Sequence, residues 1–481
     1  MTAAADPRRW KALAVLGVAY LMVVLDVSIV NVALPSIQTD LGFNPEDLQW
    51  VVSGYALTFG GFLLLGGRIG DLLGRRRLFM VGLASFALFS LLAGLSTSPE
   101  MLIAMRLLQG AAGAVLSPSV FSIVSVTFAE GSDRNKALGI LGAIAGSGAA
   151  IGVLLGGVLT SYVGWEWIFF VNVPIGLGAL FLVPRFVTES KAEGLTRHFD
   201  SLGAATVTGG LMLLVYGLTQ TTNYGWTSVR TLGAMLAALV LLGAFILIEL
   251  RSRSPLMPLS FFRHRTPAAA NLIGFGLGTV VFGMFFLLSL YQQQVLGFSA
   301  METGFGYLAV ALTAVAASGL AQALVTKIQV KKVLAAGMAL LTLGLLWFTQ
   351  VSPDGSYPVD LLPGFLLIGV GLGFSFVPIS IAALAGVQPA EAGLASGLIN
   401  TSQQIGGALG IAALSSIATS ATSDAIATGT EPAVALTNGF QDAFVAGGIV
   451  AFIGILVAIF VVRGRDLEEV PEVQPAFEQA A

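Results

Sequence analysis

Long apolar runs constrain the fold of this 481-residue chain more than any other feature of its sequence. Runs of about 20 predominantly apolar residues recur along its length, and each can cross a hydrocarbon core about 30 Å thick as a helix. Only 10% of the residues are charged, against about 25% in a soluble globular domain. The sequence therefore predicts an all-α polytopic membrane protein and excludes a water-soluble enzyme. We expect fourteen spans, near residues 12–34, 48–66, 78–96, 101–128, 137–160, 166–185, 201–220, 231–250, 268–291, 303–325, 333–350, 361–385, 393–418 and 441–462.

The basic residues alternate between the two sides that these spans define. Every Lys and Arg except Arg106 and Arg230 falls in a terminal segment or in a loop on the same side as the termini. Because loops rich in Lys and Arg stay on the cytoplasmic side, both termini are predicted to be cytoplasmic. The opposite side carries Arg230 alone, and Arg106 lies inside the fourth span.

Composition also limits the chemistry that the chain can perform. It has no Cys, which excludes thiolate catalysis, disulfides and lipidation on Cys. Its two histidines, His198 and His264, fall in predicted linkers, and the sequence has neither an HExxH zinc motif nor a GxxxxGKS or GxxxxGKT phosphate loop. A net charge of −3 with scattered basic residues gives no face for nucleic acid. We therefore expect no enzyme activity, no metal and no cofactor, and an ion gradient as the energy source for any active transport.

The basic linkers divide the chain into four parts. Residues 1–185 hold six spans, and residues 186–267 hold two further spans between cytoplasmic linkers. Residues 268–465 hold six more, and the Glu- and Pro-rich residues 466–481 are expected to form a disordered cytoplasmic tail. The Ala-, Ser- and Thr-rich loop near residues 419–440 is likewise expected to be solvated and mobile.

Asp26 is an acidic residue near the middle of the first predicted span. A charge at that depth costs roughly 2.5 to 3.5 kcal/mol on insertion scales, so such a group faces a cavity, finds a partner or becomes neutral. Arg106 lies within about 6 Å of the same depth, and its long side chain can reach Asp26. The sequence predicts an ion pair that forms and breaks with protonation. The alternatives are an acid satisfied permanently by a neighbouring helix, and an Arg106 that extends to the outer interface or braces two helices.

Small, polar and aromatic residues supply further candidates. Glycines at four-residue spacing let helices approach closely and slide, although close packing without movement is an equal interpretation. A substrate pocket is expected to use polar and aromatic side chains of several spans, for which hydrogen bonding between helices and lipid contact are the alternatives. The glycines of the fifth span are Gly139, Gly148, Gly152, Gly156 and Gly157, and the pocket candidates are Asn31, Tyr55, Phe59, Gln109, Phe282, Phe286, Asn400 and Gln404.

These motifs together resemble the major facilitator superfamily and, within it, the fourteen-span drug:proton antiporter branch. The resemblance covers nearly the whole chain. The segment from Gly67 to Arg77 resembles the loop motif GxxxDRxGRR, with Leu72 in place of the usual basic residue. The segment from Leu25 to Pro35 resembles the first-span motif, and the segment from Arg106 to Gly113 resembles the fourth-span motif.

Two further segments resemble the family pattern but depart from it at one position each. The glycines from Gly139 to Gly157 are similar to the antiporter signature of the fifth span, but Val153 stands where the family usually has proline. In the segment Trp165-Glu166-Trp167, Glu166 replaces the family's usual basic residue.

The resemblance implies a fold, a function and roles for these residues. It implies two six-helix bundles with the substrate cavity between them, and spans seven and eight as an insertion. Asp26 would couple transport to protons with Arg106 as its modulator, and a cytoplasmic latch would hold the outward-open state. The implied function is proton-coupled export of small amphipathic drugs or antibiotics by alternating access, by a monomer in a bacterial cytoplasmic membrane. The latch residues are Gly67, Asp71, Gly74, Arg75 and Arg76.

Two rival functions are compatible with the sequence. The same fold serves dedicated exporters of one natural product or lipid, which a panel of unrelated compounds separates from multidrug exporters. A membrane-embedded enzyme or a sensor without transport activity is the rival from another class. The lack of a catalytic motif and of any sizeable soluble segment disfavours that second rival.

Overall fold

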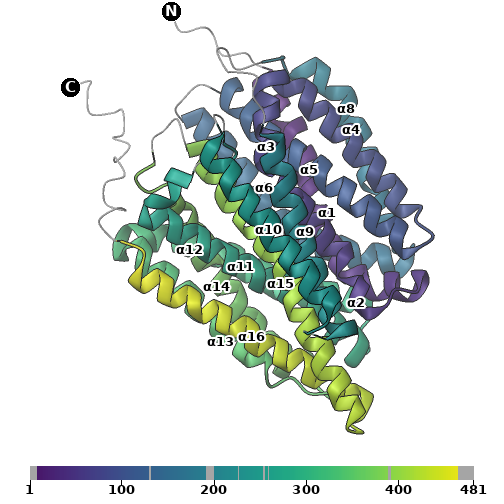
Figure 1. Cartoon of the computed structure of the whole chain (residues 1–481). Coiled ribbons are helices and arrows are strands. Elements are labelled where there is room, and N and C mark those ends of the chain that lie inside the picture. The colour runs from purple at the N-terminus through teal and green to yellow at the C-terminus, as the bar shows by residue number, and fades with distance from the viewer. Residues whose placement is uncertain are drawn as a thin grey trace, which may run out of the picture.

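The computed structural model describes residues 8–128, 132–190, 200–225, 227–252, 255–257, 259–387 and 392–463, and all regular secondary structure within them is helical. This agrees with the predicted all-α class. Successive long helices run in opposite directions (Figure 1). They are α1 (Arg9–Leu41), α3 (Trp50–Leu73), α4 (Arg75–Gly94), α5 (Pro99–Thr127), α6 (Ser132–Tyr162), α8 (Asn172–Phe186), α9 (Ser201–Tyr224), α10 (Val229–Arg251), α11 (Arg265–Leu290), α12 (Ala300–Ile328), α13 (Val330–Phe348), α14 (Leu362–Ala383), α15 (Ala392–Ala427) and α16 (Pro432–Phe460).

Short helical elements join some of the long helices. The single turns α2 (Pro45–Leu48) and α7 (Trp167–Phe170) precede α3 and α8, and the 3₁₀ turn η1 (Leu259–Arg263) precedes α11. Two π-helical turns, η2 (Tyr291–Val295) after α11 and η3 (Tyr357–Leu361) before α14, widen the helix locally. Such turns are rare and are found frequently at functional sites.

Twelve helices within the described residues are long and apolar enough to cross a membrane. They correspond to all the predicted spans except the second and the fifth. α3 and α6 lie at those two positions, and some of their side chains are outside the described residues. The helices run past the predicted limits of the spans; α1, for example, has 33 residues.

The prediction of a mobile loop near residues 419–440 is wrong. α15 continues to Ala427 and α16 begins at Pro432, so most of the segment is helical. Alanine has the highest helix propensity, and the two helices pack closely there, since a Cβ added to Gly439 would overlap the backbone of Ala418. The predicted tail at residues 466–481 lies outside the described residues.

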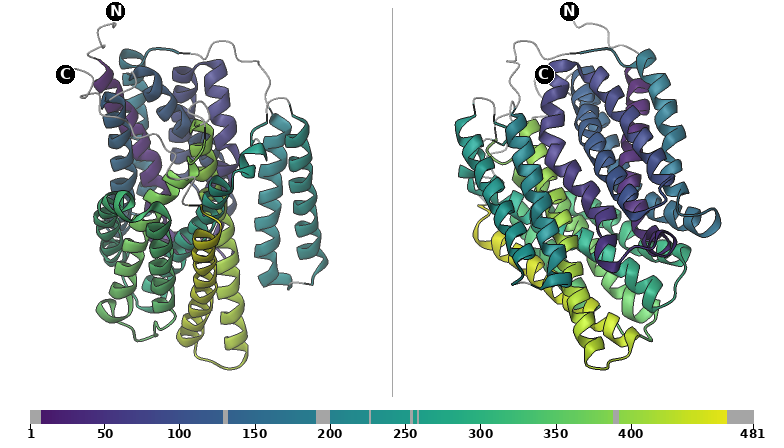
Figure 2. Two further views of the ribbon diagram at one scale, coloured as in Figure 1. Left: turned by 90° about the vertical axis from the view of Figure 1, so that its left-hand side faces the viewer. Right: turned by 45° about the vertical axis from the view of Figure 1, so that its right-hand side comes forward.

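The long helices form two groups with a pair beside them. Helices α1–α8, the N-terminal group, pack mainly on one another, as do α11–α16, the C-terminal group. Between the groups, α6 contacts α12 and α3 contacts α15. The remaining pair, α9 and α10, stands at one side, where α9 touches both α3 and α15 (Figures 1 and 2).

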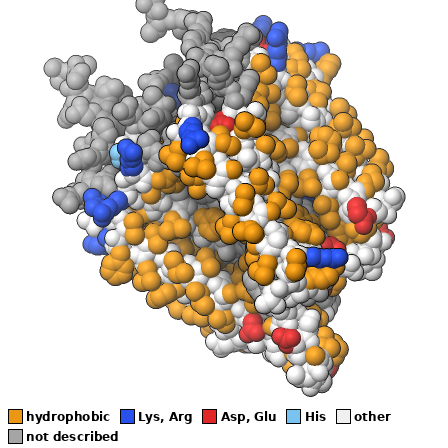
Figure 3. Space-filling model, in the orientation of Figure 1, with side chains coloured by type: hydrophobic (Ala, Val, Ile, Leu, Met, Phe, Trp, Pro, Cys, Tyr) orange, Lys and Arg blue, Asp and Glu red, His pale blue; other side chains and the backbone are white. Residues whose placement is uncertain are grey.

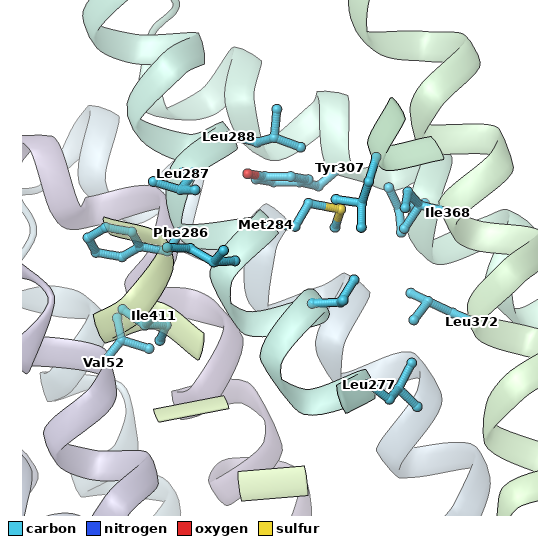
Figure 4. Packing of buried hydrophobic residues seen from close by; sticks show 14 of the residues in the cluster. Val52, Leu277, Met284, Phe286, Leu287, Leu288, Tyr307, Ile368, Leu372 and Ile411 are labelled. Atoms are coloured by element: carbon cyan, nitrogen blue, oxygen red, sulfur yellow. The ribbon is translucent and has the colours of Figure 1, made fainter. Parts of the chain in front are cut away.

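One apolar cluster extends across both groups. It includes Val52 of α3, Phe286 of α11 and Ile411 of α15, each at most 3% exposed. In Figure 4, Val52 and Ile411 lie close together, with Phe286 directly above them. Because such close-packed interiors transmit strain, a displacement of one group is felt by the other.

The two ends of the molecule differ in charge. α1 begins at Arg9 at one end, called here the Arg9 end, and finishes at Leu41 at the other, called the Leu41 end. Most of the Lys and Arg side chains visible in Figure 3 gather toward the Arg9 end, and most of the Asp and Glu side chains lie toward the Leu41 end. The surface between them is largely apolar, as contact with lipid requires.

Candidate functional site

Asp26 and Arg106 are in direct contact within the N-terminal group. Arg106 Nη1 donates to Asp26 Oδ2 at 2.5 Å, and the side chains of Arg106 and Asp26 are 1% and 0% exposed, respectively. Asp26 belongs to α1 and Arg106 to α5, so the ion pair joins two helices. The structure thus brings together the two charges whose similar depth in the membrane suggested a pair.

Two side-chain amides complete the surroundings of Asp26. Gln109 Nε2 donates to Asp26 Oδ1 at 2.8 Å, and Asn172 Nδ2 donates to the same oxygen at 2.9 Å. Gln109 Oε1 in turn accepts a hydrogen bond from Arg106 Nη1 at 2.7 Å. The four side chains come from α1, α5 and α8 and form one buried network centred on the carboxylate. Such networks strengthen in a low-dielectric interior when their groups are paired.

The network continues to α4 through residues that the sequence analysis did not place in the site. Asn172 Nδ2 also donates to Ser90 Oγ at 3.0 Å, and Ser90 Oγ donates to Phe169 O at 2.8 Å. Ser90 and Asn172 are both fully buried. An isolated neutral polar residue in an apolar segment signals a hydrogen bond between helices but does not identify the partner.

Arg106 has further neighbours from α3 and α7. Its Nε donates to Val51 O at 2.9 Å. Its Cζ lies 4.3 Å from the centroid of the Tyr55 ring and 5.6 Å from that of Phe169. The faces of aromatic rings attract cations, so the guanidinium is held by a carboxylate, a carbonyl and two rings.

Each charge of this buried pair is balanced by the other. A proton on Asp26 would cancel the charge that faces Arg106 and would leave the guanidinium without its ionic partner. Removal of one partner from a buried ion pair costs about 3 to 5 kcal/mol. Loss of either charge would therefore weaken the contact between α1 and α5.

Glycines of α6 bring that helix against α1 beside Asp26. A Cβ added to Gly152 would lie 3.0 Å from Leu25 O, and one added to Gly156 would lie 2.6 Å from Ile29 O. Gly148 faces side chains of the preceding part of α1, where an added Cβ would lie 2.8 Å from Val24 Cγ1. Contacts with backbone atoms cannot be relieved by a side-chain rotation, so this face of α6 requires glycine.

Gly157 faces the C-terminal group instead. A Cβ added to Gly157 would lie 2.8 Å from Ala300 O, and one added to Gly304 of α12 would lie 2.9 Å from Val153 O. α6 and α12 therefore cross at two glycines, one from each group. Gly139 also lies in α6, and its surroundings are outside the described residues.

The segment from Gly67 to Arg77 turns between α3 and α4 at Gly74, whose φ is +116°. The carboxylate of Glu189, which follows α8, accepts the backbone N–H groups of Arg76 and Arg77, each at 3.1 Å. A carboxylate at a helix N-terminus also interacts favourably with the helix dipole. A Cβ on Gly74 would lie 2.8 Å from Glu189 Oε1, so glycine is required at this turn.

The other predicted latch residues are partly described. Arg75 N donates to Ser190 O at 3.0 Å, beside the contact with Glu189. A Cβ added to Gly67 would lie 3.5 Å from Pro118 Cβ, an ordinary packing distance. The side chain of Asp71 lies outside the described residues.

The aromatic pocket candidates lie in two places. Tyr55 stacks on Phe59, with 5.8 Å between the ring centroids, beside the charged network. Phe286 is buried in the apolar cluster between the groups (Figure 4). The half-buried ring of Phe282 packs against Gly407 of α15, where an added Cβ would lie 2.8 Å from the ring.

The polar pocket candidates are dispersed, apart from Gln109 in the charged network. Asn31 Nδ2 donates to Val27 O at 3.3 Å, and its Oδ1 is buried without a partner in the described part of the chain. Gln404 of α15 is 8% exposed and packs against Gly60 of α3. Asn400, one turn earlier on α15, is half-buried.

Several hydrogen bonds join the two groups near the Leu41 end. Gln293 Nε2 donates to Val32 O at 2.8 Å, and Gln294 Nε2 donates to Gln38 Oε1 at 2.8 Å. Both glutamines belong to the π-helical turn η2, which directs them toward α1. Two more bonds, Met301 N to Ser161 Oγ at 3.2 Å and Ser415 Oγ to Gln49 Oε1 at 2.6 Å, lie at the same end.

Comparison with known proteins agrees with this architecture. Residues 16–411 match the family model described as Major Facilitator Superfamily. The chain is 38% identical to the puromycin resistance protein pur8 of Streptomyces alboniger over 94% of this chain and 91% of that protein. It is 40% identical to the cephamycin export protein CmcT of Amycolatopsis lactamdurans, over 92% and 90% of the two chains.

A third relative and a solved structure extend the comparison. The multidrug resistance protein Stp of Mycobacterium tuberculosis (strain CDC 1551 / Oshkosh) is 35% identical over 83% of this chain and 74% of its own length. A crystal structure of the peptide transporter POT in complex with sulfate superposes with a TM-score of 0.69 at 16% identity, over 95% of both chains, and shows a shared fold. The chain is therefore a transporter rather than an enzyme, and it belongs to the Major Facilitator Superfamily.

Proposed function

We propose that this chain exports antibiotics or related small amphipathic compounds in exchange for protons. Relatives named for puromycin resistance, cephamycin export and multidrug resistance support this substrate class. The two helix groups, which meet through α6 and α12 and through α3 and α15, supply the moving parts of an alternating-access cycle.

The observation that carries the proposal is the buried network around Asp26. When the outer side is open, a proton neutralises Asp26 and Arg106 loses its ionic partner. The guanidinium then keeps only its contacts with Val51, Gln109 and the aromatic rings, and the surrounding helices shift. Release of the proton on the inner side restores the carboxylate and the ion pair. Because protonated and deprotonated networks favour different helix arrangements, the proton gradient drives the cycle.

We place the Arg9 end in the cytoplasm and the Leu41 end outside, in accordance with the distribution of Lys and Arg. α3 and α6 complete a set of fourteen spans in a bacterial cytoplasmic membrane. The N-terminal and C-terminal groups, within residues 1–185 and 268–465, act as two six-helix bundles, and α9 and α10, within residues 186–267, are an insertion. The hydrogen bonds at the Leu41 end then correspond to an arrangement closed to the outside. The chain works as a monomer.

The segment from Gly67 to Arg77 serves in this account as a cytoplasmic latch. In the arrangement closed to the outside, its backbone is held by Glu189 within the N-terminal group. Asp71 and Arg75 engage the other group when the outer side opens, as the family motif implies. The latch therefore exchanges one set of contacts for another during the cycle.

A dedicated exporter of a single natural product is the alternative within the same fold. The names of two relatives refer to one compound each, puromycin and cephamycin, and favour a narrow range, whereas the name of Stp favours a broad one. A panel of puromycin, a cephamycin and several lipophilic cations separates the two, because a dedicated exporter moves one chemical class only.

Inverted membrane vesicles from cells that express the chain test the proposal. Respiration acidifies the lumen of such vesicles, so an exporter driven by protons concentrates its substrate inside. We expect uptake of at least one compound of the panel, loss of that uptake when a protonophore is added, and no requirement for ATP. Uptake that persists with the protonophore, or no uptake of any compound by a correctly folded protein, would contradict the proposal.

A further inference from the structure

The Leu41 end carries a cavity of about 760 Å³ between the two helix groups. Its walls are formed by the end of α1, by the end of α6 with the connection to α7, and by the segment from η2 to the start of α12. This volume is in the range of about 300 to 1,000 Å³ that is typical of sites for small organic ligands. Residues of both groups therefore face a space that can hold one such ligand.

The charge of this cavity is negative. Asp40 and Glu166 line it, and its described lining includes no Lys or Arg. Several further acidic residues lie at this end, and Arg230, in the first turn of α10, is the one basic residue there within the described part of the chain. A cleft with one sign of charge raises the local concentration of ions of opposite charge. Cations are therefore attracted to this end and concentrated at the cavity.

Glu166 stands in the segment where the family pattern has a basic residue. The preceding Gly164 has a φ of +113°, and a Cβ added to it would lie 2.5 Å from Glu166 Oε2. The carboxylate thus folds back over the turn and lies at the cavity wall. The replacement of a basic residue by Glu166 reverses the charge at this position of the wall.

Aromatic and polar groups complete the site. Trp165 Nε1 donates to Asp40 Oδ2 at 2.9 Å and fixes one oxygen of that exposed carboxylate. Phe298, from the C-terminal group, is half-buried in the opposite wall. Thr160 Oγ1 is buried in the lining and has no hydrogen-bond partner within the described residues. Carboxylates combined with an aromatic ring suit an organic cation.

We propose that this cavity binds a small organic cation with an aromatic ring, and that the bound cation holds the two helix groups together at the Leu41 end. Glu166 belongs to the N-terminal group and Phe298 to the C-terminal group. When the groups separate, the bound cation therefore loses its contacts with one of them. A ligand that favours one arrangement shifts the population toward it. That the cation arrives from outside the cell rests on the proposed orientation, whereas the binding does not.

Equilibrium dialysis with radiolabelled benzyltrimethylammonium tests the binding site. The full chain in nanodiscs of zwitterionic lipid should bind this probe saturably. Glu166→Gln should weaken binding about fivefold, which is the effect of one charge at about 4 Å in water. Phe298→Leu should weaken it about two- to fivefold without changing any charge.

The control is Glu431→Gln, which removes an exposed carboxylate at the same end but outside the cavity. It should bind the probe as the native chain does. Equal weakening in Glu431→Gln and Glu166→Gln would overturn the proposal, because it would show a general attraction to the acidic end. A folded native chain without saturable binding, or one that binds uncharged benzyl alcohol as tightly, would also overturn it. Dialysis requires no transport, so this test can fail or succeed independently of the proposed export.

A cysteine pair tests the effect on the two groups. The chain has no native Cys, and Met301 N lies 3.2 Å from Ser161 Oγ across the junction of the groups. In a Ser161→Cys, Met301→Cys double variant, the probe should increase the rate of disulfide formation at least twofold. An unchanged or slower rate, measured with probe that is shown to be bound, would overturn the proposal that the cation holds the groups together.

Discussion

Gln109 follows Arg106 by three residues on α5, and its side-chain amide links that arginine to the carboxylate of α1. The amide oxygen accepts from Arg106 Nη1 at 2.7 Å, and the amide nitrogen donates to Asp26 at 2.8 Å. Arg106 and Asp26 are therefore connected twice, once directly and once through Gln109. In the proposed cycle, the second link would keep the arginine near Asp26 while the carboxylate carries a proton, so that the ion pair can form again.

The strength of this pair is measurable by a double-mutant cycle. Arg106→Gln should lower the free energy of unfolding by about 3 to 5 kcal/mol, because Asp26 is left buried without its counter-ion. Asp26→Asn in the same chain should then recover at least about 1 kcal/mol, since contacting residues are coupled. Unfolding in detergent, followed by circular dichroism, gives these values.

Arg230→Gln serves as the control for that cycle. Arg230 is exposed and donates to Tyr224 Oη at the Leu41 end, so its removal should change stability by no more than about 0.5 kcal/mol. If the double variant lost as much unfolding free energy as Arg106→Gln and Asp26→Asn lose together, the two charges would not interact across α1 and α5.

The contact between α6 and α1 predicts opposite effects for two glycine substitutions. Gly156→Ala should destabilise the protein by about 1 to 3 kcal/mol and impair transport, because its Cβ would lie 2.6 Å from Ile29 O and would push the helices apart. Gly178→Ala on α8 meets no atom within 4 Å and should be neutral or stabilising by up to about 1 kcal/mol. Thermal unfolding and export by the two variants check this, and equal behaviour would show that the α6 glycines carry no packing constraint.

The turn before α4 predicts strain at Gly74. Gly74→Ala should cost about 1 to 3 kcal/mol, because φ is +116° and the added Cβ would lie 2.8 Å from Glu189 Oε1. Glu189→Gln should cost only about 0.3 to 1 kcal/mol, since it removes the charge at the helix N-terminus and keeps an acceptor. Unfolding measurements on both variants test whether Gly74→Ala is the more destabilising change. A larger loss of unfolding free energy for Glu189→Gln would contradict this prediction. Gly233→Ala, which meets no atom within 4 Å on α10, is the control.

The junction at the Leu41 end predicts a reversible lock. A disulfide between Ser161→Cys and Met301→Cys should abolish export, because α6 and α12 have to separate when the outer side opens. Reduction with dithiothreitol should restore it. Each single cysteine variant should export at the native rate under both conditions, and export by the oxidised double variant would show that this end does not open during transport.

The sequence predicted twelve of the spans and the central pair because their signals are physical and local. A run of about 20 apolar residues is long enough for a membrane helix, and charges as rare as Asp26 and Arg106 have few partners to choose from inside a bilayer. Their pairing followed from depth alone. The helical class and the family could be predicted for the same reason, since the motifs occupy fixed positions on those spans.

Other features of the site depend on distant contacts that leave no local signal. Ser90 and Asn172 are neutral, so nothing in the sequence connects them with Asp26. Glu189 caps α4 from more than 100 residues away, and only the folded chain brings its carboxylate to Arg76. The error near residues 419–440 has another cause. A segment rich in Ala, Ser and Thr resembles a solvated loop, but alanine favours a helix and α16 packs against α15.

Substrate-induced proton movement shows whether Asp26 couples transport to protons. The native chain, Asp26→Asn and the exposed control Asp424→Asn are reconstituted in proteoliposomes with a pH-sensitive dye, and a substrate identified in the vesicle panel is added. We expect proton release by the native chain and by Asp424→Asn, and none by a folded Asp26→Asn. Proton release by Asp26→Asn at the native rate would contradict the role of Asp26 in coupling.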